Sequence, residues 1–187
     1  SRSLALAGAH SGDITERPLR FSIQAPIGST CTIRTKEHDM ANDIDLDGVT
    51  AFSLQLSPWA HIATVGPDGA PDVVPVHPCW DGGTLWIMLG TTSVKAHNVA
   101  TNANVALHWQ VTEVGDGIEV WGTATLHDDI ETKRRLWNDV FDYDLNAFAP
   151  GGPDDSPDTA FLAITPQRAL VLRQYGMGGS MRWSADA

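Results

Sequence analysis

The sequence predicts a mainly β protein, in which six or more short antiparallel strands form a closed or partly closed barrel with peripheral helices. Short runs of apolar and β-branched residues recur along the chain, and glycine- and aspartate-rich turns separate them. Only two or three segments show the apolar spacing of a helix. This pattern favours a barrel, and 187 residues that are 42% hydrophobic can bury one ordinary core.

The first half of the expected barrel begins with a helix at 45–55, where apolar residues recur at helical spacing before Pro58 ends the pattern. Strands are predicted at 59–65 and 72–80, because the turn sequence Gly66-Pro67-Asp68-Gly69 joins two runs of apolar and β-branched residues. We therefore expect a β-hairpin directly after the first helix.

Three prolines, Pro71, Pro75 and Pro78, lie in or beside the second predicted strand. Each one removes a backbone donor, so this strand must lie at a sheet edge or bulge where another group, such as a ligand, approaches its backbone. Asp81-Gly82-Gly83 then turns the chain into a strand at 84–89.

The second half begins at Thr91-Thr92-Ser93, whose hydroxyl groups are suited to cap a short helix. The elements predicted after this cap are a helix at 94–101, a hairpin of strands at 105–111 and 118–126, a helix from Asp128 or Asp129 to about Asp142, a loop at 143–158, and closing strands at 161–165 and 169–175 before a glycine-rich tail.

Charge divides the chain into two parts. Residues 1–39 hold five basic and four acidic groups and show no clear periodicity, whereas residues 40–187 hold seven basic and nineteen acidic groups, a balance of −12 within the formal net charge of −11. We interpret 1–39 as an N-terminal extension that is non-native or poorly ordered, and 40–187 as the barrel domain. So acidic a surface repels nucleic acid and anionic membranes, and neither is expected as a partner.

Two cysteines, Cys31 and Cys79, are too few for a disulfide framework, which favours a reducing cytoplasmic location. No apolar run approaches the length of a membrane span or the core of a secretion signal.

The segment Thr91-Thr92-Ser93-Val94-Lys95 carries the clearest functional signal. The start of a helix offers free N–H groups and partial positive charge, which suit a phosphate group. Lys95 is the only basic residue between Met40 and Thr132, so it would be the local counter-charge that a phosphate needs on an acidic protein. We predict phosphate binding here.

Other chemistries receive less support from the sequence. Strand tryptophans could line a slot for a planar ring, although each is more typical of barrel core; they are Trp59, Trp80, Trp86, Trp109 and Trp121. No histidine pair has metal-ligand spacing on a predicted helix, and no cysteine or carboxylate accompanies the histidines in a zinc pattern, so no metal site is predicted. Nucleophile-elbow and Walker motifs are absent from the sequence, and no catalytic side chain is assigned.

A series of short motifs, in order and at consistent spacing over about 46–173, resembles the pyridoxamine 5'-phosphate oxidase-like superfamily of FMN-binding split barrels. The general-stress-protein and flavin/deazaflavin oxidoreductase branches are the most similar, since they share a helix like 129–137. The motifs are His61-Ile62-Ala63-Thr64-Val65-x-x-Asp68-Gly69-x-Pro71, Val74-Pro75-Val76, Leu85-Trp86-Ile87, Thr92-Ser93-x-Lys95, Asn102-x-Asn104-Val105 and Val120-x-Gly122-x-Ala124.

This resemblance implies a homodimer with FMN between the protomers and eleven residues around the cofactor. Ring contacts would come from the backbone of Val74, Pro75 and Val76, ribityl contacts from Met88 and Thr91, phosphate contacts from Thr92, Ser93 and Lys95, and contacts from the facing subunit from Trp109, Gln110 and Trp121. The implied activity is hydride transfer to or from a small substrate, with the chemistry supplied by the flavin.

Two departures from the family pattern limit which substrate and cofactor are expected. The chain has Arg173-Gln174-Tyr175-Gly176 and Arg182-Trp183 where a true pyridoxamine-phosphate oxidase carries an Arg-x-His-x-Arg-like segment for its substrate, so vitamin B6 oxidation is not expected. A second basic residue expected near 72–77 is also missing. The deazaflavin F-420 therefore remains an alternative cofactor, and a non-enzymatic flavin- or haem-binding stress protein remains an alternative function.

Overall fold

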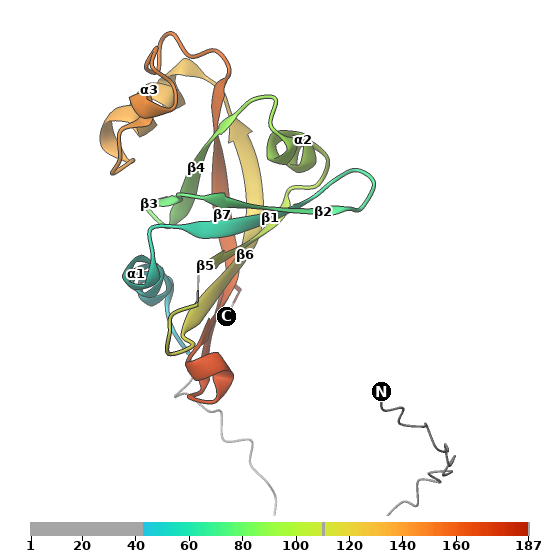
Figure 1. The fold of residues 1–187 in the computed structure, drawn as a ribbon, viewed down its shortest axis with the longest axis vertical. Coiled ribbons are helices and arrows are strands. Elements are labelled where there is room, and N and C mark those ends of the chain that lie inside the picture. The colour runs from blue at the N-terminus through green and yellow to red at the C-terminus, as the bar shows by residue number, and fades with distance from the viewer. Residues whose placement is uncertain (1–42, 110, 187) are drawn as a thin grey trace, which may run out of the picture. The chain divides into compact units, whose positions relative to one another are not determined.

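A computed structural model describes residues 43–109 and 111–186, so the predicted extension at 1–39 lies outside the described residues. Within the described part, an eight-stranded antiparallel sheet is accompanied by three α-helices (Figure 1). The elements in chain order are α1 (Leu46–Leu56), β1 (Ala60–Val65), β2 (Pro71–Val76), β3 (Cys79–Asp81), β4 (Thr84–Gly90), α2 (Val94–Thr101), β5 (Asn104–Trp109), β6 (Gly117–His127), α3 (Ile130–Asp139), the 3-10 turn η2 (Leu145–Ala147), β7 (Thr159–Leu172), the 3-10 turn η3 (Gln174–Gly176) and β8 (Ser180–Ser184).

The sheet runs in the order β2-β1-β5-β6-β7-β4-β3, with β8 added to β7. β1 and β2 cross in front of the longer strands β4, β6 and β7, so the sheet folds over on itself (Figure 1). The 14-residue β7 pairs with β6 along almost its whole length, while its other edge pairs first with β4 and then with β8. This double pairing joins the two ends of the barrel through one strand.

Two groups of buried side chains form the interior. The larger fills the barrel and contains fully buried residues such as Ile62, Leu107, Ile118 and Ile164. The smaller lies between α3 and the start of β7, and its buried members are Trp86, Leu136, Leu145 and Phe161. Burial of apolar surface in the smaller group holds α3 and the loop after it to the barrel.

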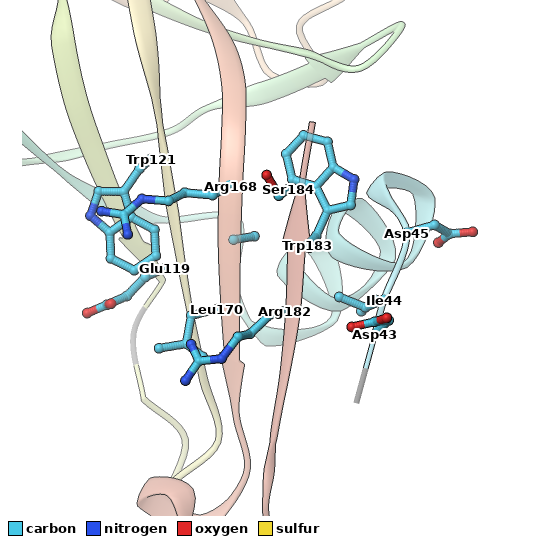
Figure 2. A pocket seen from close by; sticks show the side chains of 11 residues that line it. Asp43, Ile44, Asp45, Glu119, Trp121, Arg168, Leu170, Arg182, Trp183 and Ser184 are labelled. Carbon is cyan, nitrogen blue, oxygen red and sulfur yellow. The ribbon is translucent and has the colours of Figure 1, made fainter. Parts of the chain in front are cut away.

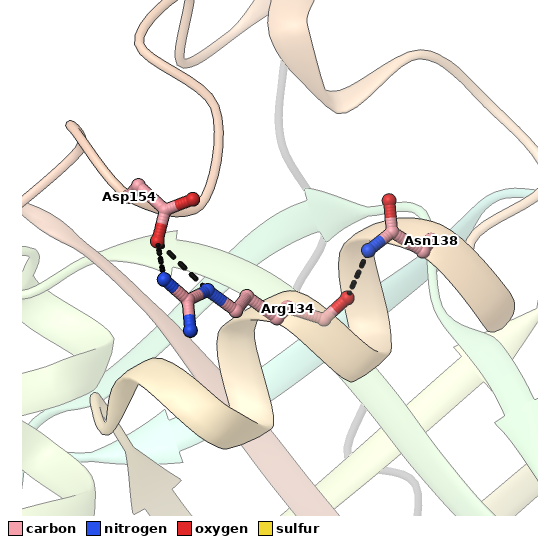
Figure 3. A network of polar contacts seen from close by, with 3 residues as sticks. All are labelled: Arg134, Asn138 and Asp154. Atoms are coloured by element: carbon pink, nitrogen blue, oxygen red, sulfur yellow. Dashed lines mark hydrogen bonds and ion pairs between the residues drawn. The ribbon is translucent and has the colours of Figure 1, made fainter.

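α3 is also tied to that loop by polar contacts. Arg134 donates through Nε to the Asp154 carboxylate at 2.8 Å, and Asn138 donates to the Arg134 carbonyl at 2.8 Å (Figure 3). The buried Lys133 ammonium donates to the carbonyl of Ser156 at 3.2 Å. These contacts supplement the apolar packing, which is the larger effect in placing the loop at 140–158.

The mainly β architecture and the edge position of β2, inferred from its prolines, are confirmed. The predicted strand at 72–80 is wrong as one element: it is β2 and β3, separated at His77-Pro78, because Pro78 offers no N–H to continue the ladder. The predicted helix from 128 or 129 to about 142 ends earlier, at Asp139.

The two predicted closing strands at 161–165 and 169–175 are in fact the single strand β7, which ends at Leu172, so that 174–175 belong to η3. The glycine-rich tail contains the strand β8. β7 continues through Pro166, which lies between the stretches that pair with β4 and with β8, where its missing N–H costs no ladder hydrogen bond on that edge. Opposite it, the β6 register shifts between Trp121 and Gly122.

Gly122 gives a direct test of this bulge. A Cβ at Gly122 would lie 2.2 Å from the carbonyl oxygen of Thr165, which is rigid strand backbone. We expect Gly122→Ala to lower the free energy of unfolding by about 3 kcal/mol, as in severe overpacking, measured by urea denaturation. Gly90→Ala is the matched strand control, because its nearest neighbour lies at 3.7 Å. Equal stability of the two variants would contradict the close approach at the bulge.

The turn at η3 is held by the β5–β6 loop. Gln174 and Tyr175 have φ values of 50° and 57°, a region that residues other than glycine rarely adopt. The Asp116 carboxylate accepts from Arg173 Nη1 at 2.7 Å and from the Gln174 N–H at 3.0 Å. These hydrogen bonds, that from Arg173 first, hold the pKa of Asp116 below its ordinary value of 3.8.

A depressed carboxyl pKa contributes stability above the ordinary value, and this contribution is lost as the pH falls through the lower folded-state value. We therefore expect Asp116→Asn to reduce the free energy of unfolding at neutral pH, and the difference from the wild type to shrink below about pH 4. Urea denaturation across this pH range measures it. A difference that stays constant down to strong acid would show that ionised Asp116 does not stabilise the turn.

Candidate cofactor-binding site

A pocket of about 790 Å³ lies between β2, β4, the start of α2 and the loop after α3. Its apolar walls come from both sides of the pocket and include Trp59, Pro75, Val76, Met88 and Phe148. Its polar lining includes His77, Lys95, Tyr143, Asp144 and Asp158. A volume of this size and a mainly apolar wall with few polar groups are typical of small-molecule and cofactor sites.

The strand side of the pocket follows from the edge position of β2. Pro75 and Val76 end this strand, and they pair with His61 and Ala60 of β1 on one side only. The second edge of β2 is free of strand partners among the described residues. β4 supplies Met88, Leu89 and Gly90, so the pocket lies where the end of β2 and the end of β4 come close to α2.

The start of α2 supplies the positive end of the pocket. Ser93 is the N-cap, and its hydroxyl accepts from the N–H of Ala96 at 3.4 Å. By helix geometry the N–H groups of Val94 and Lys95 have no acceptor within the helix. The half-buried Lys95 side chain lines the pocket and makes no ion pair within the described part of the chain.

Two carboxylates share the pocket with this ammonium group. The Asp144 side chain accepts from the Asn146 N–H of its own turn at 2.9 Å. The backbone carbonyl of Asp158 accepts from the Thr91 N–H at 2.8 Å, which fixes the β4–α2 turn against the start of β7. Because both carboxylates repel an anion, a phosphate group in this pocket is favoured only beside Lys95 and the first turn of α2.

Four of the eleven cofactor residues implied by the resemblance line this pocket together: Pro75, Val76, Met88 and Lys95. Val74, Thr91, Thr92 and Ser93 are their chain neighbours and do not line it. Trp109 is only 2% exposed and belongs to the barrel core, so its indole faces neither this pocket nor the surface. Gln110 lies outside the described residues.

Trp121 lies elsewhere, in a second groove of about 830 Å³ on the face formed by β6, β7 and β8 (Figure 2). The Arg168 guanidinium stacks over its ring at 4.1 Å from the centroid, a cation–π contact between neighbouring strands. Arg182 and Trp183 of β8 line the other side of the groove. Within one chain, Trp121 is therefore not part of the pocket that holds Lys95.

The pocket wall contributed by the loop after α3 was not predicted from the sequence. Tyr143, Asp144 and Phe148 reach the pocket only because α3 and η2 carry the loop back over β4. His77 was also missed as a pocket residue. Its ring stacks on Tyr143 at 4.2 Å between centroids and an angle of 19°, which joins the β2–β3 link to the loop.

Perturbed titratable groups gather beside this wall. Burial lowers the pKa of His77, and the nearby Asp142 partly opposes that shift. Burial also raises the pKa of the Cys79 thiol to about 11 and raises the pKa of Tyr143. The sequence showed no cysteine or carboxylate with the histidines in a zinc pattern, whereas in the structure the ligand atoms of His77, Cys79 and Asp142 lie within 4.8 Å of one another.

Solved structures similar to this chain share its fold. A protein related to general stress protein 26 of Bacillus subtilis, from Clostridium acetobutylicum, is 21% identical, with a TM-score of 0.62 over 76% of this chain and 98% of that one. A pyridoxamine 5'-phosphate oxidase-related, FMN binding protein from Nostoc punctiforme is 20% identical, with a TM-score of 0.56 over 73% and 87%. General stress protein 26 from Bacillus anthracis is 22% identical, with a TM-score of 0.53 over 66% and 94%.

No curated protein matches the chain significantly. Among the described residues, no helix combines the length and apolar character needed to cross a membrane. The family model described as pyridoxamine 5'-phosphate oxidase matches residues 48–173, which is more than half of the chain and contains the edge strand, Lys95 and most of the loop wall. The chain therefore belongs to the pyridoxamine 5'-phosphate oxidase-like family of FMN-binding split barrels.

Proposed function

We propose that this protein binds FMN in the pocket between β2, β4 and α2 and acts as an FMN-dependent oxidoreductase on a small substrate. The observation that carries the proposal is the position of Lys95. It places an ammonium group without an ion pair among the described residues at one end of a pocket whose other walls are largely apolar. A planar ring joined to a phosphate by a flexible chain has this same division between an apolar end and an anionic end.

The residues present fit such a group. Pro75 and Val76 present the end of an edge strand, whose outer backbone groups can meet a polar ring edge. Met88 and Trp59 offer polarisable and aromatic surface to a flat ring. Lys95 and the free N–H groups of α2 stabilise the phosphate.

Bound FMN would supply hydride transfer, which needs no acid or base from the chain. The chain's own part is to orient the ring between β2, β4 and the loop wall and to keep water away from it. Trp59, 53% exposed, and Phe148, 69% exposed, line the open side of the pocket. This division of labour explains why no catalytic triad or dyad stands out in the sequence.

Charge in the pocket also limits the substrate. Lys95 is the only lysine or arginine among the residues that line this pocket. Because the cofactor phosphate would occupy it, a second phosphate on the substrate would meet Asp144 and Asp158 without a counter-charge. We therefore propose a small substrate without a phosphate group, and not pyridoxamine phosphate.

We further propose that two copies of the chain assemble around this pocket. Exposed apolar side chains occur both at the pocket, where Trp59 and Phe148 line it, and on the edge strand β2, where Val73 is 59% exposed. Exposed apolar surface of this kind favours a protein–protein contact. A second copy would exclude water from the ring, which the walls of one chain leave open.

The role of Lys95 is tested by comparing FMN with riboflavin, which lacks the phosphate. We expect Lys95→Ala to weaken FMN binding about 10- to 100-fold, the range for loss of a charged hydrogen bond, and to leave riboflavin binding unchanged. Titration followed by flavin and tryptophan fluorescence measures both affinities. Arg134→Ala is the control, because it removes the same charge from an exposed ion pair outside the pocket.

If Lys95→Ala lowered the affinities for FMN and riboflavin by the same factor, Lys95 would support the pocket without binding the phosphate. Failure of FMN to bind to the wild type, together with tight binding of F-420, would replace FMN by the deazaflavin in the same pocket. Reduced cofactor that reacts only with oxygen, whatever organic acceptor is offered, would overturn the enzymatic part of the proposal.

The proposed dimer is tested at the edge strand. We expect the wild type to have the mass of a dimer by light scattering, and Val73→Asp to shift it toward the monomer, because a carboxylate would be buried in the contact. FMN affinity should fall together with the dimer. Thr125→Asp, on an exposed position of β6, is the control. A monomeric wild type that binds FMN tightly would exclude the shared site.

A further inference from the structure

We propose that His77, Cys79 and Asp142 form a site for a divalent transition metal ion, with zinc as the preferred ion. The three residues come from two separate segments, the link from β2 to β3 and the residues just after α3. Their nitrogen, sulfur and oxygen atoms all lie within 4.8 Å of one another. This site does not depend on the function proposed for the cofactor pocket.

The distances match a tetrahedral metal centre. His77 Nε2 lies 3.5 Å from Asp142 Oδ1, and Cys79 Sγ lies 3.5 Å from the same oxygen. Zinc bonds of about 2.0–2.3 Å at tetrahedral angles place neighbouring ligand atoms about 3.3–3.8 Å apart. Two ligand separations are therefore already those of a zinc site, and a small side-chain adjustment brings the third into range.

Packing holds the ligands in this arrangement. The His77 ring lies between Tyr143, stacked at 4.2 Å, and Trp59, tilted at 4.8 Å, with Nε2 directed toward Asp142. Cys79 is 7% exposed and is fixed by its pairing with Trp86 in the β3–β4 ladder. A metal ion would therefore find its nitrogen and sulfur ligands largely preorganised.

The chemistry of the ligands selects the metal. A thiolate, an imidazole and a carboxylate together suit zinc, whereas magnesium and calcium prefer oxygen ligands only. The two anionic ligands would balance the charge of a divalent ion. The Asp142 side chain is 72% exposed, so a fourth position faces solvent and can accept water or a small ligand.

Metal binding here would also stabilise the wall of the cofactor pocket. Asp142 directly precedes Tyr143 and Asp144, which line the pocket, and His77, stacked on Tyr143, lines it as well. An ion bound to both segments would cross-link the β2–β3 link to the loop after α3. In the structure these segments are joined by the thiol–carboxylate hydrogen bond at 3.5 Å, the His77–Asp142 contact at 3.5 Å and the stacked rings.

The test uses the full-length chain, stripped of metal with a chelator and free of any histidine tag, and titrated with zinc against a chromophoric chelator. We expect saturation at one zinc ion per chain. We expect Asp142→Asn and Cys79→Ser each to weaken zinc binding by at least tenfold, since each removes a direct ligand. Asp139→Asn is the matched control: it removes the same charge three residues earlier, at an exposed position.

Cobalt in place of zinc gives a second readout that does not depend on affinity alone. The wild type should show the intense visible bands of tetrahedral cobalt and a thiolate-to-cobalt charge-transfer band. Cys79→Ser should lose the charge-transfer band, while Cys31→Ser should keep it. Circular dichroism of each apo variant shows whether the barrel remains folded, and Asp142→Asn, an exposed position, covers the case in which Cys79→Ser unfolds.

Absence of saturable zinc binding would overturn the proposal and leave a hydrogen-bonded cluster. The same conclusion would follow if Asp142→Asn bound zinc as tightly as the wild type, or if the charge-transfer band disappeared with Cys31 and not with Cys79. Lys95→Ala should bind zinc like the wild type, so failure of the flavin proposal and failure of the metal proposal are distinguishable.

Discussion

The pairing of β7 is the constraint on which the rest of this structure depends. One edge of the strand is occupied by β6, and the other is shared between β4 and β8. Pro166 lies where the pairing partner on this edge changes from β4 to β8, and it has no N–H to leave unpaired there. Opposite it, Gly122 on β6 has no side chain to collide with the Thr165 carbonyl. This arrangement positions the end of β4 against the start of β7, and the Thr91 N–H bonds to Asp158 across that junction. The start of α2, and with it Lys95, is thereby fixed at the pocket.

Electrostatics explains why so acidic a chain can still offer a site for an anion. The formal charge of −11 opposes any phosphate at long range, but salt screens that repulsion over about 10 Å. Lys95 and the unpaired N–H groups of the first α2 turn act over much shorter distances. Asp144 and Asp158 restrict the favourable region to this end of the pocket. The two carboxylates therefore help to orient an anionic ligand in the pocket, because its phosphate is favourable only at the end beside Lys95.

Much of the barrel could be predicted from the sequence, because short local sequence patterns determine most of its elements. The Gly66-Pro67-Asp68-Gly69 turn, the Ser93 cap and the prolines of β2 each determine structure within a few residues, and the helix α2 has the predicted bounds. The continuity of β7 through Pro166 could not be predicted, because the tolerance of a proline inside a strand depends on which strands pair with its two edges. The strand β8 was missed because Ser180-Met181-Arg182-Trp183 is too short a pattern to stand out after several glycines.

Only those residues of the candidate site that stand out within a short stretch of sequence could be predicted. Lys95 and the β2 residues stand out by charge and by proline, whereas the loop wall depends on contacts between segments 63 residues apart, such as that between Cys79 and Asp142. Exposed ion pairs such as Arg134–Asp154 contribute little to holding that wall. Most of the stabilisation of that wall comes from the buried cluster of Trp86, Leu136, Leu145 and Phe161, because burial of apolar surface is the larger effect. The cofactor pocket thus depends on packing beneath α3 as much as on the residues that line it.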